Sequence, residues 1–139
     1  MELSAMNVSV GLLLLRLTTG MLFFFQGYDK VFKVGLKQVV DTFKDPMQRT
    51  LIPGDFLKPL IGLSSYIEMF AGVFLALGVF RDISLYLLAA DLAAVAIAFS
   101  SLKAMWDMQY FFPRFLFVFL LLMIPAEADS FTLSRLLPF

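Results

Sequence analysis

The chain contains neither cysteine nor histidine among its 139 residues. Without cysteine it can form no disulfide, no dithiol redox relay and no cysteine-ligated iron–sulfur cluster. Without histidine it cannot provide a histidine-ligated haem, a histidine-rich metal centre or an imidazole that shuttles protons near neutral pH. We therefore expect no metal site and no covalently bound cofactor.

Charge is also scarce. Only 16% of the residues are charged, whereas a soluble domain usually carries about 25%. The eleven basic and eleven acidic residues cancel, so no strong electrostatic field recruits nucleic acid. Hydrophobic residues make up 60% of the chain and its mean hydropathy is +0.87, which indicates an integral membrane protein. At this length we expect one domain, residues 1–139, with no separate soluble catalytic module.

Four apolar runs predict transmembrane helices at about residues 8–28, 60–80, 83–102 and 110–125. A helix rises about 1.5 Å per residue, so about twenty residues cross a hydrocarbon core of roughly 30 Å. Between the first two runs, apolar residues at helical spacing over residues 36–45 predict a short amphipathic helix. The predicted fold is therefore all-α: a four-transmembrane-helix bundle with an amphipathic helix in the first connecting loop.

The N-terminal run is expected to remain as the first span. Glu2 stands where a signal peptide would carry basic residues, and the apolar run continues through Arg16. Lysine and arginine are concentrated in the first and third connections, which predicts that both termini lie outside the cytoplasm. We expect a multi-pass protein of the inner (plasma) membrane of the cell.

Three of the runs carry one charged side chain near their middle: Arg16, Glu68 and Asp91. An ionised side chain at the bilayer centre costs roughly 2.5–3.5 kcal/mol, so each of these should face protein. In the first run the polar face is a stripe at helical spacing, formed by Arg16, Thr19, Phe23, Gln26 and Lys30. We predict that the three charged groups meet inside the bundle.

Two roles fit such a cluster. In the first, Arg16 bridges both acids and fixes the register of the helices. In the second, the cluster lines a pocket for a quinone ring or another amphipathic ligand, such as a lipid. Arg16 and Gln26 would donate hydrogen bonds to carbonyl oxygens, and Glu68 or Asp91 would accompany proton uptake. The predicted ligand-binding residues are Arg16, Gln26, Ser64, Tyr66, Glu68 and Asp91, with Trp106 as a further candidate.

The chain resembles the DoxX family of small four-helix membrane proteins. The resemblance rests on Leu15-Arg16-Leu17, Gly20, Phe23 and Gly27 to Lys30, on Ile67-Glu68, Gly72, Leu77-Gly78 and Arg81, on the alanine-rich third run, and on the closing segment from Asp129-Ser130 to Leu136. It implies a four-helix bundle and an association with membrane redox systems, since some members are subunits of thiosulfate:quinone oxidoreductases. Many members have histidine before the glycine of the first span, where this chain has Gln26, so no histidine-dependent role is carried over.

Together these observations predict an accessory component of a quinone-linked membrane redox system. Membrane lipid and other membrane subunits would be its partners, and a partner would supply the electrons. Two alternatives stay open: a non-catalytic structural or scaffold subunit of a larger membrane complex, and, less favoured, transport of a small solute or ion by a homo-oligomer. Whether the protein is an enzyme is left undecided by the sequence.

Overall fold

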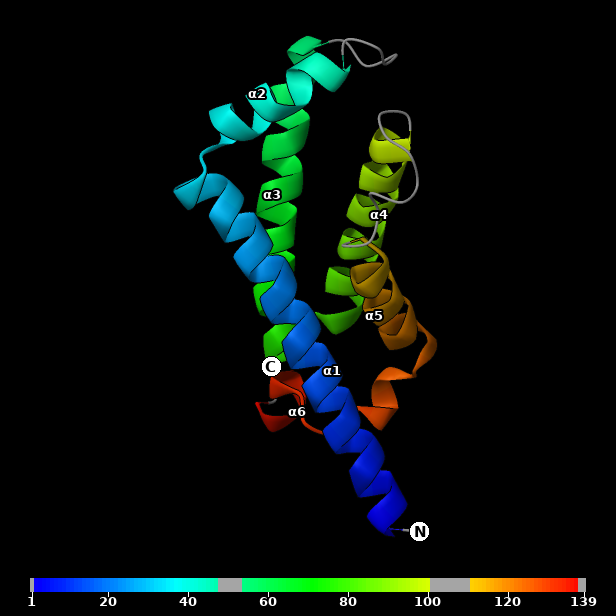
Figure 1. The fold of residues 1–139 in the computed structure, drawn as a ribbon. Helices are drawn as coiled ribbons and strands as arrows, with labels where there is room; N and C mark the ends of the chain where they lie inside the picture. Colours follow the sequence, from blue (N-terminus) through cyan, green and yellow to red (C-terminus); the bar gives the residue numbers. More distant parts are fainter. Residues whose placement is uncertain (1, 48–53, 101–110, 138–139) are drawn as a thin grey trace.

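The computed structural model describes residues 2–47, 54–100 and 111–137, and every regular element in these ranges is a helix (Figure 1). The all-α prediction is confirmed. The elements are α1 (Glu2–Tyr28), a π-helical turn η1 (Asp29–Lys33), α2 (Leu36–Met47), α3 (Gly54–Leu77), α4 (Arg81–Ser100), α5 (Phe111–Met123), a short 3-10 turn η3 (Ala126–Ala128) and α6 (Leu133–Leu136).

Two stretches are long and apolar enough to cross a membrane, Leu3–Lys33 in α1 and η1, and Lys58–Leu77 in α3. They contain most of the first two predicted spans. The third predicted run becomes α4, which has 20 residues, and the fourth becomes α5, which is apolar but has 13 residues. At about 1.5 Å per residue α5 is about 20 Å long, shorter than a bilayer core. The structure thus establishes an all-helical bundle with two long apolar helices.

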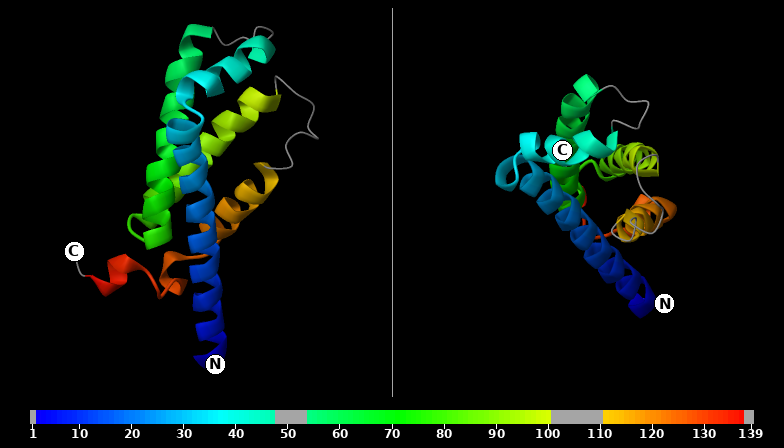
Figure 2. Two further views of the ribbon diagram at one scale, coloured as in Figure 1. Left: turned by 60° about the vertical axis from the view of Figure 1, so that its left-hand side comes forward. Right: turned by 45° about the horizontal axis from the view of Figure 1, so that its top comes forward.

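Helices α1 and α3 run antiparallel and side by side (Figures 1 and 2). Gly20 lies against Gly72 and Ala76, while Gly27 lies against the backbone of α3 at Ser65. A Cβ atom on Gly20 would stand 2.5 Å from the carbonyl oxygen of Gly72, inside van der Waals contact. Small residues are what let membrane helices approach this closely, so these glycines fix the register of the pair.

The turn between α3 and α4 is short, as the sequence predicts. Gly78 has a φ of 71°, and its N–H donates to the carbonyl of Leu75. The N–H of Val79 donates to the carbonyl of Phe74, which completes a Schellman cap at the end of α3. This cap reverses the chain, so α4 packs antiparallel against α3.

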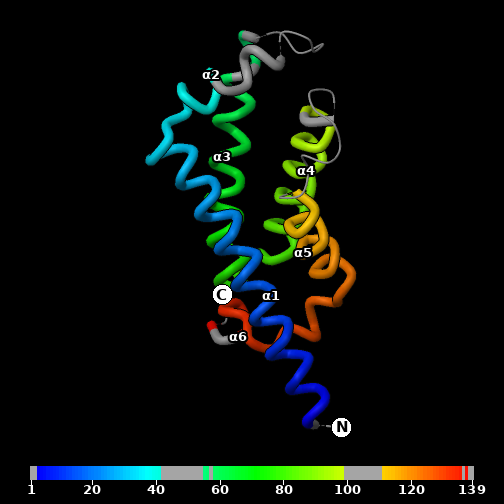
Figure 3. Tube along the Cα trace, in the orientation of Figure 1, coloured from blue at the N-terminus to red at the C-terminus, as the bar shows by residue number. Residues whose placement is uncertain are grey.

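The apolar core occupies the half of the bundle nearest this turn. Its buried members come from α1, α3, α4 and α5: Leu12, Phe23, Ala71, Leu75, Leu85, Leu88, Leu92, Val118 and Leu121. Beyond this core α4 leans away from α3, as the tube in Figure 3 shows. The predicted amphipathic helix is present as α2, which crosses the far end of α3 with Val40 buried and Lys37 exposed.

Candidate functional site

The buried charged side chains fall into two groups. The Glu68 cluster lies midway along the bundle and comprises Gln26, Lys30, Ser64, Glu68, Asp91 and Arg114. The Arg16 cluster lies at the end near the α3–α4 turn and comprises Arg16, Arg81 and Asp129.

The carboxylate of Glu68 is the centre of the first cluster. Glu68 projects from α3 and is 1% exposed. The Nζ of Lys30 lies 2.9 Å from its Oε1 and 2.7 Å from its Oε2, and Gln26 Nε2 donates to Oε1 at 2.8 Å. Lys30 sits in the π-helical turn η1, and such turns often occur at functional sites. A buried carboxylate therefore has charge-assisted hydrogen bonds to both oxygens.

Two further charged groups reach this centre from α4 and α5. Asp91 of α4 is 7% exposed and interacts with the hydroxyl of Ser64, while its Oδ2 has no hydrogen-bond partner among the described residues. The charges of Asp91 and of Arg114 on α5 both act on Glu68. All four long elements of the bundle thus contribute to one polar centre, as the sequence predicts for Glu68 and Asp91.

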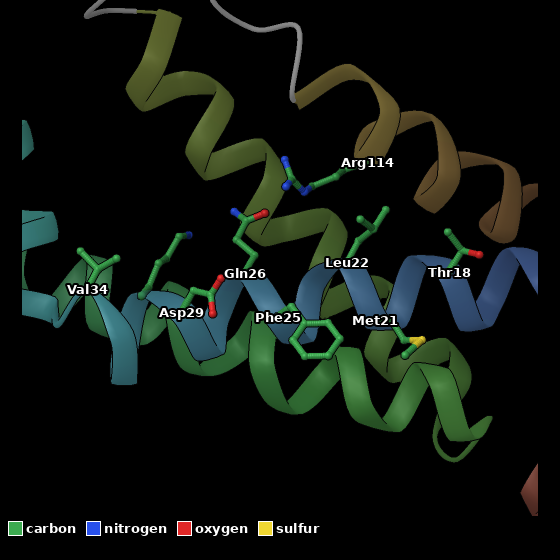
Figure 4. Close-up of a pocket in the computed structure, with 9 residues that line it drawn as sticks. Thr18, Met21, Leu22, Phe25, Gln26, Asp29, Val34 and Arg114 are labelled. Atoms are coloured by element: carbon green, nitrogen blue, oxygen red, sulfur yellow. The ribbon is translucent and has the colours of Figure 1, made fainter.

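A groove of about 620 Å³ opens beside this cluster (Figure 4). It is lined by Thr18, Met21, Leu22, Phe25, Gln26, Asp29, Lys30, Val34 and Arg114. Figure 4 shows Leu22 and Gln26 pointing from α1 toward α5, and Arg114 extending from α5 above Gln26. The part of the groove toward Thr18 is mostly apolar, and its other part is polar. The buried Oε1 of Gln26 has no hydrogen-bond partner within the described ranges.

Arg16 belongs to the second cluster, so the predicted meeting of Arg16 with Glu68 and Asp91 is wrong. Its Nε lies 3.0 Å from Oδ2 of Asp129. Its other nitrogens donate to the carbonyl oxygens of Leu75, Ala76 and Phe131 at 3.1, 2.6 and 2.6 Å. Arg16 therefore bridges the end of α3 and the C-terminal tail.

The register of α1 against α3 explains this separation. The glycine contacts place Gln26 opposite Glu68 and Arg16 opposite Gly78. Ten residues of α1 separate Arg16 from Gln26, a distance of about 15 Å along the helix axis. The position of a residue within the predicted run 8–28 did not indicate its depth in the bundle, because α1 begins at Glu2, before that run.

Sequence reasoning missed Lys30, Arg114 and Asp129 as members of these clusters. Lys30 shares a helical stripe with Gln26, so the stripe was a usable signal for it. Arg114 and Asp129 join their clusters through tertiary contacts that no local spacing reveals. Tyr66 lies outside the Glu68 cluster: it is 43% exposed and stacks on Phe70. Trp106 falls outside the described residues.

The comparison with known protein families shows to which family the chain belongs. The family model described as DoxX matches residues 11–107. The chain belongs to the DoxX family. The match confirms the resemblance and indicates a membrane protein. No curated protein and no solved structure shows a significant match. The matched range of this DoxX protein includes Gln26, Lys30, Glu68 and Asp91.

Proposed function

We propose that this DoxX protein crosses the inner membrane four times and binds a quinone in the groove between α1 and α5, as an accessory component of a membrane redox system. The observation that carries the proposal is the groove, in which an apolar wall leads to a polar end formed by Gln26, Lys30 and Arg114.

The size and shape of the groove suit an amphipathic molecule. Its volume of about 620 Å³ lies within the usual range of ligand sites, about 300–1,000 Å³. The apolar wall from Thr18 to Phe25 is about 10 Å long at 1.5 Å per residue. A quinone ring would occupy the polar end, and its isoprenoid tail would follow the wall toward lipid.

The polar end offers hydrogen bonds to both redox forms of such a ring. The ammonium of Lys30 has three N–H groups, and its described contacts are with the two oxygens of Glu68. A further N–H of Lys30 and the guanidinium of Arg114 would donate to quinone carbonyl oxygens. The Oε1 of Gln26 would accept a hydrogen bond from a quinol hydroxyl.

The charges of the cluster favour a neutral headgroup. The cations Lys30 and Arg114 are balanced by the acids Glu68 and Asp91, and Asp29 pairs with Lys33 at 3.0 Å. A phosphate would place an extra negative charge beside two buried carboxylates, which costs free energy in a low-dielectric site. A quinone ring therefore fits better than an anionic phospholipid.

Reduction of a quinone to a quinol consumes two electrons and two protons. This sequence has no cysteine or histidine with which to hold an iron–sulfur cluster or a histidine-ligated haem, so a partner redox protein would supply both electrons. Glu68 and Asp91 stand behind the proposed ring position as groups that exchange protons with it. This division of labour makes the protein an accessory component.

The proposal of four spans rests on the burial of charge in α4. Its 20 residues extend about 30 Å, and Asp91 at its middle faces the bundle. A helix in the bilayer would bury its acid in this way, whereas a helix at the surface would have no need to.

A binding measurement with two matched lysine variants tests the proposed function. The protein is reconstituted into quinone-free nanodiscs, and a short-chain quinone is titrated by equilibrium dialysis. Lys30→Met should weaken binding by at least about tenfold, because a charge-assisted hydrogen bond contributes about 1.5–3 kcal/mol. Lys37→Met removes the same charge from an exposed position that does not line the groove, so binding should be unchanged.

Equal binding by the two variants would reject the quinone site. Displacement of the quinone by phosphatidylglycerol would assign the groove to lipid instead. Purification with a stoichiometric membrane partner, but without quinone or lipid in the groove, would favour the scaffold function.

A further inference from the structure

The second charged group, the Arg16 cluster, joins three parts of the bundle, the tail, α1 and α4, through one carboxylate. Asp129 lies in the tail after η3 and is 0% exposed. Its Oδ2 stands 3.0 Å from Nε of Arg16 on α1 and 3.9 Å from Nε of Arg81 at the start of α4. A fully buried carboxylate between two buried guanidinium groups thus links the tail to the helices.

Each arginine of the cluster also caps a helix. Arg16 donates to the last carbonyl groups of α3, at Leu75 and Ala76. Arg81 donates to the carbonyl oxygens of Leu121 and Ile124, at the end of α5, at 2.6 and 2.9 Å. The last carbonyl groups of a helix lack partners within the helix and carry partial negative charge, so cations are favoured there. Asp129 therefore holds together the two cations that fix the ends of α3 and α5.

Two serine hydroxyl groups also attach the tail to the rest of the bundle, at one point before and one point after Asp129 along the tail. The hydroxyl of Ser9 on α1 donates to the carbonyl of Ala128, and Ser134 donates to the carbonyl of Gly78 in the α3–α4 turn. Thr132 between them is buried. The tail is thus seated on α1 and on the α3–α4 turn, at the end of the bundle where α1 contributes Leu12 and α5 contributes Leu121 to the core.

The Arg16 cluster lies next to the groove along α1. On α1 the groove begins at Thr18, two residues after Arg16, and on α5 it is reached by Arg114, seven residues before Leu121. The cluster therefore joins the middle of α1, at Arg16, to the end of α5, which Arg81 binds, and it lies where the separation of these two helices can be set.

We propose that Asp129 is a positioning residue that sets the separation of α1 and α5, and thereby the width of the groove. Without its negative charge, Arg16 and Arg81 face each other with no carboxylate between them. Asp82 does not replace it, because it contacts Arg81 from the surface and is 60% exposed. Repulsion between the two guanidinium groups would move the α4–α5 pair away from α1, while the glycine contacts keep α1 and α3 together.

The absence of native cysteine allows this movement to be measured directly. Spin labels are placed at Leu14→Cys on α1 and Phe119→Cys on α5, both exposed, and distances are measured by double electron–electron resonance in nanodiscs. A second pair, Leu17→Cys and Phe74→Cys, reports on α1 and α3. In Asp129→Asn the α1–α5 distance should increase by more than about 2 Å, the size of a true rearrangement, while the α1–α3 distance stays constant.

Three controls separate this role from general destabilisation. Glu127→Gln removes one exposed charge from the same end of the bundle and should change neither distance. Asp129→Glu should restore the wild-type α1–α5 distance. If Asp129→Asn fails to fold, Asp129→Asn combined with Arg81→Gln removes the repulsion and keeps an N–H donor for the end of α5, and the double variant should recover both folding and the wild-type separation.

An unchanged α1–α5 distance in folded Asp129→Asn would overturn the proposal, as would failure of the double variant to recover. The consequence for ligand binding rests on the proposed function: quinone affinity should fall in Asp129→Asn in step with the distance change. If the α1–α5 distance increases in Asp129→Asn while quinone affinity stays at the wild-type value, the groove is not the quinone site, and the positioning role of Asp129 stands.

Discussion

Replacing Gly20 by alanine should destabilise the protein strongly, although alanine is the better helix former. The new Cβ would lie 2.5 Å from the carbonyl oxygen of Gly72 and 2.7 Å from Cβ of Ala76. That is roughly 1 Å short of van der Waals contact, and the nearest atom is backbone that cannot rotate away. Overpacking of this kind costs about 1–3 kcal/mol, and we expect the upper half of that range because α1 and α3 must separate.

Gly11 provides the matched control within the same helix. No atom lies within 4 Å of a Cβ built on Gly11. Gly11→Ala should therefore stabilise the protein slightly, by up to about 1 kcal/mol of helix propensity. Because both variants gain the same helix propensity, they should differ by the overpacking cost, about 2–3 kcal/mol in free energy of unfolding, measured by circular dichroism in mixed detergent micelles with increasing sodium dodecyl sulfate. Equal stabilities would refute the close α1–α3 packing and the register derived from it.

Three further predictions concern single contacts. Arg16→Met should lower the free energy of unfolding by about 3–5 kcal/mol in the same assay, because it leaves a buried carboxylate unpaired, and a melt as stable as the wild type would contradict the ion pair. Glu68→Gln should raise the rate at which an amine-reactive reagent modifies Lys30 roughly fivefold, as measured by mass spectrometry. This is the change expected when the Lys30–Glu68 ion pair loses about 1 kcal/mol. Gly78→Ala should destabilise the protein more than Gly35→Ala in thermal melts. Both glycines have positive φ, which costs alanine about 1–2 kcal/mol, but only at Gly78 would the new Cβ lie 2.5 Å from Arg16. Equal losses of stability would contradict that contact.

The structure and the family match support a DoxX membrane protein with two polar centres that differ in surroundings. The Glu68 cluster borders an open groove, and its lysine is 26% exposed at the side chain. The Arg16 cluster is sealed by the tail, with side-chain exposures of 1% for Arg16 and 0% for Asp129. This contrast favours the first centre for the proposed ligand binding and the second for the proposed positioning role. Of the two roles predicted from the sequence, the bridge from Arg16 to Glu68 and Asp91 is wrong, because Arg16 pairs with Asp129, and the quinone pocket stays a prediction.

The sequence alone determined the class of the protein, its helices and the faces that they bury. Hydrophobic runs and glycine spacing are local patterns, and the free energies behind them, such as those for helix formation and for placing a charge in lipid, act within a single segment. The predicted stripe on α1 is the clearest case: Arg16, Thr19 and Phe23 are all buried.

Only the tertiary structure decided which charges meet. The register of α1 against α3 depends on backbone contacts at Gly20 and Gly27, and a shift of a few residues would give Arg16 a different partner. Asp129 lies more than a hundred residues from Arg16 along the chain, and the path of the tail brings it there. Ion pairing in a bundle follows from how whole helices slide and tilt against one another, a choice that the spacing within any one helix leaves free.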